Sequence, residues 1–324
     1  MQAYCIESAS RSLALQERPA PIPGPDELRV RVVCTALNRA DLLQVRGHYP
    51  APFGVPDDIP GLEYAGEVLE VGARVTAFKP GDRVMGLVGG GAFAEELLTH
   101  EREALPVPSS LTFEQAAAIP EAFLTAYDAL FLQAGLRGAE RVLIHAVTSG
   151  VGTAASQLAA HAGATVIGTS RSAEKLQGLL RLGVHHPLKV DAGPPRFAQA
   201  VRDLVGGADV VLDLVGGAYL PESVEALAPR GRVILVGLLA GNEAALPLGR
   251  LLRSRASITG TVLRSRPIEE KIALARDFAR RALPLFESGA LSPVIDRVLP
   301  MAELPAAMEY MQRSAGLGKQ VLRW

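Results

Sequence analysis

Polar and apolar residues alternate along the first third of the chain, most clearly over residues 27–34 and 66–72. A period of two is typical of a strand that buries one face. Prolines and glycines interrupt these runs at short intervals, as in the turn at 80–82 that leads into another strand-like run at 83–86. This part of the sequence therefore predicts a barrel-like, antiparallel β domain.

The pattern changes near Leu111. Thr112 followed three residues later by Gln115 matches a helix capping box, and residues 121–133 carry a second helical pattern. Apolar runs then alternate with helical runs, which indicates a parallel sheet with helices on both faces. The predicted strands are 141–146, 164–169, 208–215, 231–237, 257–263 and 319–324, and the predicted helices are 150–162, 173–182, 195–205, 219–228, 267–287 and 301–313.

These patterns predict an α/β protein with two domains, because 324 residues exceed what one compact core usually holds. We assign residues 1–120, completed by 266–324, to the β-rich domain. Residues 121–265 are assigned to a Rossmann domain with a doubly wound parallel sheet.

A glycine turn follows the first predicted strand of the second domain. Ser149, Gly150, Val151 and Gly152 come between an apolar strand and a helix of small residues. This layout places backbone N–H groups and the positive end of a helix dipole against a pyrophosphate. Close packing of the helix on its own strand is the structural alternative. The position inside a strand–turn–helix unit favours dinucleotide binding.

The next strand ends without an acidic residue. Arg171, Ser172 and Lys175 stand where an acid would bind a ribose 2′-hydroxyl, and basic and hydroxyl groups suit a 2′-phosphate instead. The alternative is a solvated helix start with Ser172 as its N-cap. We therefore predict NADP (NADPH) rather than NAD as the cofactor.

Two later strands also end in glycine. Gly216, and Gly237 with Leu238 after it, fall at the carboxyl ends of predicted strands, where open α/β sheets bind ligands. Their backbone could lie against the ribose and nicotinamide, or the glycines could simply end the strands.

Composition and charge exclude several classes of function. The net charge of −1 gives no basic surface by count for nucleic acid or an anionic membrane. No apolar run reaches the roughly 18 residues of a membrane span, and the first residues lack a secretory signal pattern. Two cysteines cannot form a disulfide framework, so we expect a cytoplasmic protein.

Seven segments together carry a family resemblance: 36–41 (ALNRAD), 60–66 (PGLEYAG), 71–72 (VG), 81–84 (GDRV), 116–120 (AAAIP), 149–152 (SGVG) and 318–319 (GK). In this order they resemble the medium-chain dehydrogenase/reductase superfamily, in its zinc-independent quinone oxidoreductase (zeta-crystallin-like) branch. The resemblance implies a GroES-like barrel domain plus a Rossmann domain, and a homodimer or homotetramer. An edge strand around 257–263 is the expected contact between subunits.

The chain departs from the zinc-dependent members of that superfamily. Asn38 and Leu62 stand where those relatives carry a cysteine and a histidine, and Glu63 alone does not make a zinc site. Residues 89–93 contain none of the cysteines of the structural zinc site. The adjacent His185 and His186 fit a surface loop better than a metal site. We therefore expect no metal.

Without a metal, hydride delivery depends on positioning and on hydrogen-bond donors near the oxygen that gains charge. Asn38, Tyr49 and Thr125 resemble family residues around the nicotinamide and the substrate mouth. Their structural alternatives are a helix cap for Asn38, a partly buried tyrosine for Tyr49 and core packing for Thr125. His48 is a further possible proton source.

The sequence thus predicts an NADPH-dependent, zinc-independent reductase of quinones or related conjugated carbonyl compounds. An enoyl-thioester or alkenal reductase is the alternative within enzymes, since those share the fold and the same positional needs. A non-catalytic NADPH-binding sensor or RNA-binding protein is the alternative from another class.

Overall fold

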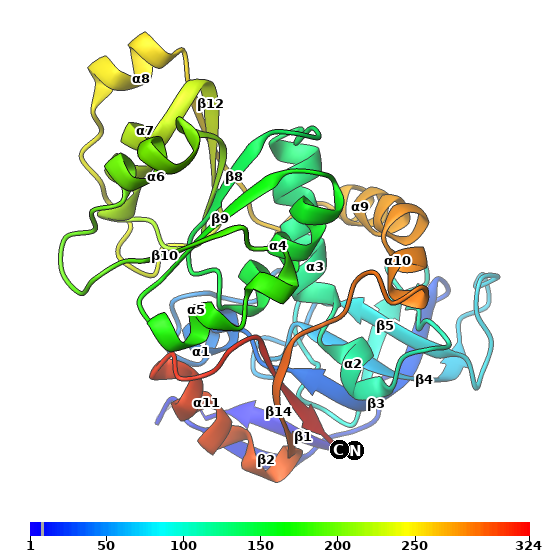
Figure 1. Cartoon of the computed structure of the whole chain (residues 1–324). Helices are drawn as coiled ribbons and strands as arrows, with labels where there is room; N and C mark the ends of the chain where they lie inside the picture. The colour runs from blue at the N-terminus through cyan, green and yellow to red at the C-terminus, as the bar shows by residue number, and fades with distance from the viewer. Residues whose placement is uncertain (8–9) are drawn as a thin grey trace. The chain divides into compact units, whose positions relative to one another are not determined.

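The computed structural model describes residues 1–7 and 10–324 (Figure 1). They form two compact units. Unit 1 consists of Met1–Leu124 and Leu263–Trp324, and unit 2 consists of Thr125–Val262. Unit 1 is therefore built from two stretches of chain with the whole of unit 2 between them.

Unit 1 contains a mostly antiparallel seven-stranded sheet with the order β14-β15-β3-β4-β5-β7, in which β6 also pairs with β3. Among the described pairs of this sheet, only β14 and β15 run parallel. A separate hairpin joins β1 to β2. The strands are β1 (Gln2–Ile6), β2 (Leu13–Glu17), β3 (Glu27–Ala36), β4 (Glu63–Val71), β5 (Arg83–Leu87), β6 (Glu96–His100), β7 (Leu105–Pro106), β14 (Ile295–Pro300) and β15 (Lys319–Arg323).

Alternation along β3 explains the core of unit 1. Leu28, Val30 and Val32 point to one side and pack with Val68 of β4 and Val84 of β5. The helices of this unit are α1 (Arg39–Val45), α2 (Phe113–Ala117), α9 (Ile268–Arg281), α10 (Leu283–Glu287), the 3-10 helix η3 (Met301–Glu303) and α11 (Leu304–Gln312). Helix α3 (Pro120–Tyr127) contains the boundary between the units.

Unit 2 is a six-stranded parallel sheet with the order β10-β9-β8-β11-β12-β13. Leu143, Ile167 and Val211 face one side and pack with residues of α6 and α7. The strands are β8 (Arg141–Ile144), β9 (Thr165–Ser170), β10 (His186–Lys189), β11 (Ala208–Asp213), β12 (Leu227–Leu235) and β13 (Ser257–Gly260). The helices are the π-helix η1 (Asp128–Gln133), α4 (Gly150–His161), α5 (Ala173–Gln177), the 3-10 helix η2 (Leu180–Leu182), α6 (Ala198–Val205), α7 (Tyr219–Ala226) and α8 (Leu248–Ser254).

This architecture confirms the predicted α/β fold with a barrel-like β unit and a parallel-sheet unit. The capping box is also confirmed, because the Gln115 N–H donates to the Thr112 hydroxyl and the Thr112 N–H donates to the Gln115 side chain. Among the described residues, no helix is both long enough and apolar enough to cross a bilayer.

Several predicted boundaries are wrong. The helix predicted at 173–182 ends at Gln177, before Gly178, and the helix predicted at 267–287 is split into α9 and α10 at Ala282, just before Pro284. The first strand of unit 2 ends at Ile144 rather than 146, because Ala146 has a left-handed backbone conformation with φ of 48°. The last strand of this sheet ends at Gly260 rather than 263.

The prediction of a surface loop at His185 and His186 is also wrong. His186 begins the edge strand β10, and the His185 ring accepts a hydrogen bond from the Val166 N–H over 3.0 Å. Pro187 hid this strand from sequence reading, although proline is tolerated on an edge strand where one N–H faces outward.

Candidate cofactor and acceptor sites

The N-terminus of α4 is the first candidate site. The Ser149 hydroxyl caps this helix by accepting from the Gly152 N–H over 3.1 Å, and the Thr153 N–H donates to the Ser149 carbonyl over 2.8 Å. The first N–H groups of a helix have no partner within it, so those of Gly150 and Val151 are left for an external acceptor. A Cβ on Gly152 would lie 2.5 Å from the Ala146 carbonyl oxygen, so this turn also needs glycine for packing.

The carboxyl end of β9 lies beside this turn. The Val147 N–H donates to the Thr169 carbonyl over 3.0 Å, which ties the two loops together. Ser172 caps α5 by accepting from the Lys175 N–H over 3.3 Å, so its structural role is confirmed. Arg171 is exposed at the same end of the strand. The geometry brings the glycine turn at 149–152 and the basic residues Arg171 and Lys175 to the carboxyl-terminal edge of one sheet.

The glycines after β11 and β12 pack against each other. Gly216 has φ of 65°, and a Cβ there would lie 2.9 Å from Leu238 and 3.0 Å from the Gly237 carbonyl oxygen. A Cβ on Gly237 would lie 2.5 Å from the Leu214 carbonyl oxygen. Both glycines therefore have a packing role, and their contact with a cofactor stays a prediction. The Leu238 side chain is 53% exposed.

Two buried polar residues of unit 2 were not singled out by sequence reasoning. His145 is fully buried at the end of β8 and bonds Thr169 and Ser223 over 2.9 Å each. Burial lowers the pKa of His145 to about 4, so this ring is neutral and structural. Asp213 ends β11, and its carboxylate accepts from the Val215 and Gly216 N–H groups, which fixes the loop that holds Gly216.

A polar cluster lies in the core of unit 1. It contains the buried Asn38, Asp41, Glu63 and Lys319 together with the half-buried Glu121, and we call it the unit 1 cluster. The Lys319 ammonium lies 2.6 Å from Glu63 Oε1 and donates to Asn38 Oδ1 over 2.5 Å and to the Leu37 carbonyl over 2.7 Å. All three of its N–H bonds are thereby used, with Glu63 fully buried and Lys319 4% exposed.

Asn38 is held on every side. Its Nδ2 donates to Glu63 Oε1 over 2.8 Å and to the Ala36 carbonyl over 3.1 Å. Both amide hydrogens are therefore engaged with protein oxygens, and none is left for a substrate oxygen in this arrangement. Asn38 is also the N-cap residue of α1, where its backbone N–H donates to the Asp41 carboxylate over 2.7 Å.

This donor set does not fit a catalytic zinc ion. A zinc site needs three protein ligands of the Cys, His or carboxylate type. Here the ammonium of Lys319 is bonded to Glu63 and Asn38, and Leu62 is an apolar side chain that is 1% exposed. The described residues hold no group of three or more His, Cys, Asp or Glu side chains arranged for a metal ion.

Two carboxyl groups of the unit 1 cluster have raised pKa values. Burial raises the pKa of Asp41 to about 7, against hydrogen bonds from Asn38 and Gly61 that favour its ionised form. Burial, together with the neighbouring Glu63 carboxylate, raises the pKa of Glu121 to about 8. Glu121 also donates its backbone N–H to Glu63 Oε2 over 2.8 Å. Asp41 and Glu121 therefore resist ionisation more strongly than ordinary carboxyl groups do.

Tyr49 belongs to the same unit, and the Glu121 carboxyl acts on it electrostatically. It is half-buried, and the guanidinium of Arg264 stands 4.9 Å from the centre of its ring. Thr125 is 7% exposed in α3 and belongs to unit 2, whereas Asn38 and Tyr49 belong to unit 1. His48 is exposed. The predicted Asn38 and Tyr49 therefore lie in the same unit, and their joint role at one site stays a prediction.

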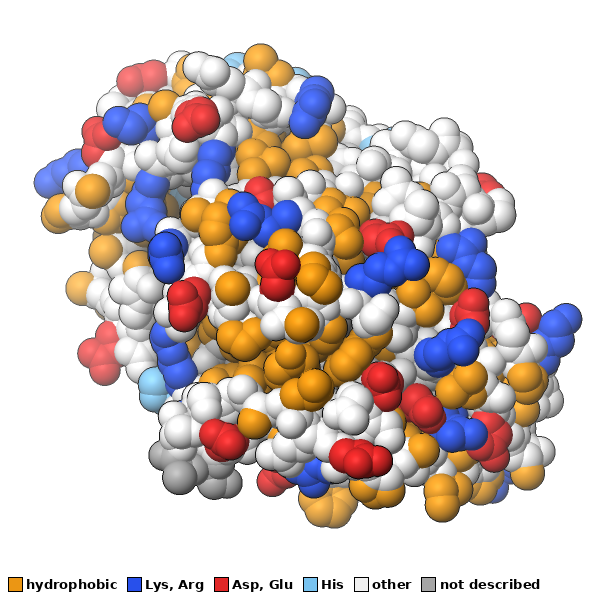
Figure 2. Space-filling view, turned by 90° about the horizontal axis from the view of Figure 1, so that it is seen from below, with side chains coloured by type: hydrophobic (Ala, Val, Ile, Leu, Met, Phe, Trp, Pro, Cys, Tyr) orange, Lys and Arg blue, Asp and Glu red, His pale blue; other side chains and the backbone are white. Residues whose placement is uncertain are grey.

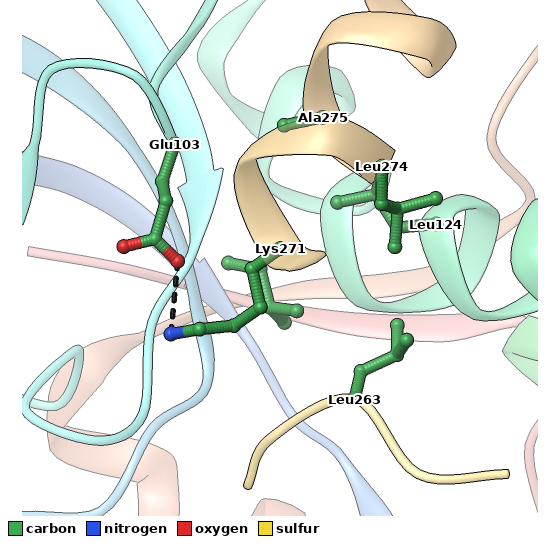
Figure 3. Close-up of a pocket in the computed structure, with 7 residues that line it drawn as sticks. Glu103, Leu124, Leu263, Lys271, Leu274 and Ala275 are labelled. Carbon is green, nitrogen blue, oxygen red and sulfur yellow. Dashed lines mark ion pairs between the residues drawn. The ribbon is translucent and has the colours of Figure 1, made fainter. Parts of the chain in front are cut away.

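A small cavity lies between α9 and the loop after β6 (Figure 3). It is lined by Leu124, Leu263 and Leu274 and bordered by an ion pair of 2.9 Å between Lys271 and Glu103. Its enclosed space is about 10 Å³, which is room for about one water molecule. This cavity cannot hold a quinone ring and belongs to the packing of unit 1.

Sequence reasoning missed Lys319, Glu121 and Arg264 as site residues. Each is a charged residue close to apolar residues in the sequence. Lys319 stands two residues before the apolar pair 321–322, Glu121 precedes the apolar run 122–124, and Arg264 follows the apolar pair 262–263. A charge in such a context is a signal of a buried, paired group. The sequence does not say which residues pair, because the partners lie far away along the chain.

Comparison with known proteins identifies the family to which the chain is related. Residues 24–109 match the model "Alcohol dehydrogenase GroES-like domain", and residues 150–280 match "Zinc-binding dehydrogenase". The human synaptic vesicle membrane protein VAT-1 homolog is 34% identical over 95% of this chain and 82% of its own length. The bovine quinone oxidoreductase-like protein 2 is 32% identical over 99% of this chain and 91% of its own length. The crystal structure of the JamJ enoyl reductase superposes with a TM-score of 0.88 at 26% identity, covering 99% of both chains.

Proposed function

The chain belongs to the medium-chain dehydrogenase/reductase superfamily, in its zeta-crystallin-like branch, and from this membership we propose that it is a metal-free, NADPH-dependent reductase of quinones. The superfamily makes it an oxidoreductase that uses a nicotinamide cofactor. The resemblance to quinone oxidoreductase-like protein 2 supports quinones as the acceptor class.

The carrying observation is that Lys319 holds Glu63 and Asn38 with its ammonium group. The cation beside Glu63 and Asn38 is the lysine ammonium and not a metal ion. The reaction therefore has to proceed without a Lewis acid beside these two residues. Quinones suit such a site, because they are already electrophilic and need only oriented hydrogen-bond donors for the oxygen that gains charge.

The residues of unit 2 fit the cofactor. The N–H groups of Gly150 and Val151 would hold the pyrophosphate at the start of α4, and Arg171 with Lys175 would hold the 2′-phosphate. Ser149 and Ser172 serve this site as helix caps. When bound, NADPH supplies a hydride.

In unit 1, Tyr49 is our proposed hydrogen-bond donor to the acceptor oxygen. Asn38 has no amide hydrogen left for this role, so we assign it to holding Lys319 and Glu63 in place. We keep Thr125 as a proposed contact near the nicotinamide.

The test is steady-state turnover with NADPH and NADH on naphthoquinone and phenanthrenequinone. We expect NADPH to be preferred, and we expect Tyr49→Phe to lower kcat while leaving the Kd for NADPH unchanged. Tyr310→Phe is the matched control, because Tyr310 lies in the same unit and also carries an arginine over its ring. Full quinone turnover by Tyr49→Phe would reject Tyr49 as the donor, and a preference for NADH would reject the cofactor assignment.

The second candidate is an enoyl-thioester or alkenal reductase. The similarity to the JamJ enoyl reductase over nearly the whole chain favours it, and a conjugated C=C bond has the same positional needs as a quinone. A crotonyl thioester and an alkenal added to the same panel would separate the two, since the preferred acceptor has the higher kcat/KM.

A sensor or RNA-binding role without catalysis has less support. On the face shown in Figure 2, basic and acidic side chains are interspersed and no basic stripe runs across it. Binding of NADPH without turnover of any acceptor in the panel would favour this role and reject ours.

We also propose a homodimer or homotetramer in the cytoplasm, joined through unit 2. Among the described strands β13 pairs only with β12, so its outer edge is open. Leu248 and Leu252 lie one turn apart on α8 and are 67% and 77% exposed. Light scattering should show a dimer or larger for the wild-type protein and a smaller species for Leu252→Glu. A monomeric wild type would reject the proposal.

A further inference from the structure

Arg264 is a buried arginine that joins three segments of unit 1. Its side chain is 6% exposed overall. Nε donates to the Gly89 carbonyl over 2.7 Å, Nη1 to the Tyr49 carbonyl over 3.1 Å, and Nη2 to the Gln44 side-chain oxygen over 2.6 Å. The planar guanidinium fork thereby fixes the end of α1, the loop that carries Tyr49 and the loop after β5 in one geometry.

Gln44 extends this arrangement along the Tyr49 loop. It is 4% exposed, and its Nε2 donates to the Asp57 carbonyl over 3.1 Å. The loop from Tyr49 to Asp57 is thus held near both ends, directly by Arg264 and through Gln44. Loops fixed in this way can present a side chain in a defined orientation.

Among residues 1–7 and 10–324, the positive charge of Arg264 has no carboxylate within ion-pair distance, and its hydrogen bonds all end on neutral oxygens. Asp41 and Glu121 act on it only at longer range. A buried charge with neutral partners is costly, and such groups are a mark of functional sites.

The charge instead faces Tyr49. The guanidinium carbon lies 4.9 Å from the centre of the Tyr49 ring. Burial raises the pKa of the Tyr49 phenol, the Glu121 carboxyl raises it further, and Arg264 opposes both. Arg264 and Glu121 are therefore the two charged groups that act on this phenol, and they act in opposite directions.

We propose that Arg264 is a positioning residue for the acceptor site, which orients Tyr49 through the loop carbonyl and makes its phenol a stronger hydrogen-bond donor. A stronger donor favours acceptors whose reduction leaves negative charge on an oxygen, such as a quinone or an enone. This inference rests on the proposed function in taking Tyr49 as the acceptor contact. It goes beyond that function because it assigns a role to Arg264, which lies outside the unit 1 cluster. That role is to strengthen, through its positive charge, the hydrogen bond that Tyr49 donates to the acceptor oxygen.

The test compares Arg264→Met, which removes the charge, with Arg264→Lys, which keeps a charge but loses the fork. The protein is labelled with fluorotyrosine, and the Tyr49 resonance in the fluorine NMR spectrum is identified by its loss in Tyr49→Phe. We expect Arg264→Met to raise the pKa of Tyr49 by about one unit. Arg264→Lys should leave most of the wild-type value. Arg83→Met is the matched control, because Arg83 stands 4.6 Å from the Phe113 ring of the same unit.

The kinetic arm uses NADPH with naphthoquinone. We expect Arg264→Met to lower kcat/KM for the quinone by about tenfold or more, and Arg264→Lys to recover part of it, at an unchanged Kd for NADPH. An unchanged Tyr49 pKa in Arg264→Met, or an equal change of that pKa in Arg83→Met, would overturn the inference. The titration needs neither cofactor nor quinone, so absence of quinone turnover in the wild type would reject the proposed function alone.

Discussion

In unit 2 the groups that we propose to hold the phosphates of a cofactor lie between residues 149 and 175, and most of them are backbone N–H groups or helix N-caps. The unit 1 cluster, in contrast, joins residues at or in α1, β4, α3 and β15. Its ion pair connects Lys319 with Glu63, and most of the sequence lies between these two residues. A site made of local backbone can be predicted from the spacing of residues in the sequence. A site made of distant charged side chains depends on the fold and becomes visible only when the fold is known.

The largest expected loss of stability comes from a change in the unit 1 cluster, the site made of distant side chains. Lys319→Met leaves the Glu63 carboxylate buried without its cation, and removing one member of a buried pair costs roughly 3–5 kcal/mol in the free energy of unfolding. Urea unfolding measures this loss. The double variant Lys319→Met, Glu63→Gln should recover part of it.

The control for this variant is Lys189→Met. Lys189 pairs with Asp191 on the surface, with side chains 54% and 84% exposed, so its loss should change stability by less than about 1 kcal/mol. Equal effects of the two variants would show that the unit 1 cluster is energetically no different from a surface pair.

Gly152→Ala tests the site of unit 2, which is made mostly of local backbone. The added Cβ would meet the Ala146 carbonyl oxygen and the Val147 backbone, so we expect a loss of roughly 1–3 kcal/mol in stability together with weaker NADPH binding. Urea unfolding and NADPH fluorescence titration check both. Gly178→Ala is the control, since the nearest atom to its Cβ is 3.9 Å away. A Gly152→Ala protein that binds NADPH normally would contradict the role of this turn.

A test of cofactor preference separates the contribution of the Arg171 and Lys175 side chains to binding from that of the backbone N–H groups. Replacing both by alanine should raise the Kd for NADPH by about tenfold or more, because charge-assisted hydrogen bonds to the 2′-phosphate are lost. The Kd for NADH should change little. Calorimetry on both cofactors gives the two values, and equal weakening of NADH would show that these residues hold another part of the molecule.

A separate test concerns pH. The pKa of Glu121 rises from an ordinary 4.5 to about 8 in the folded protein, so the folded state resists its ionisation and stability falls as the pH rises from about 4.5 to 8. Glu121→Gln removes this dependence. Thermal unfolding should show the variant gaining stability relative to the wild type at pH 8 and little at pH 5. A constant difference across this range would contradict the assignment.

The sequence predicted the parts whose cause is local. The periodicity of 27–34, the capping box at Thr112 and the helix start at Ser149 depend on neighbours within a few residues, and the structure confirms them. The edge strand at His186 and the end of the strand before Ala146 were missed, because pairing with β9 and a left-handed residue have no pattern of their own in the sequence. Asn38 was found by resemblance, but its bonded state depends on Lys319 and Glu63 and could not be derived from its own neighbourhood.

The order of synthesis gives the Glu63–Lys319 pair a further consequence. A ribosome makes Glu63 early, then all of unit 2, and only afterwards Lys319. Unit 2 is one continuous stretch and can fold as it emerges, whereas the nascent β-rich unit holds an acid whose counter-ion does not yet exist. That acid has to remain hydrated or protonated throughout translation, so closure of its surroundings is a late event of biogenesis.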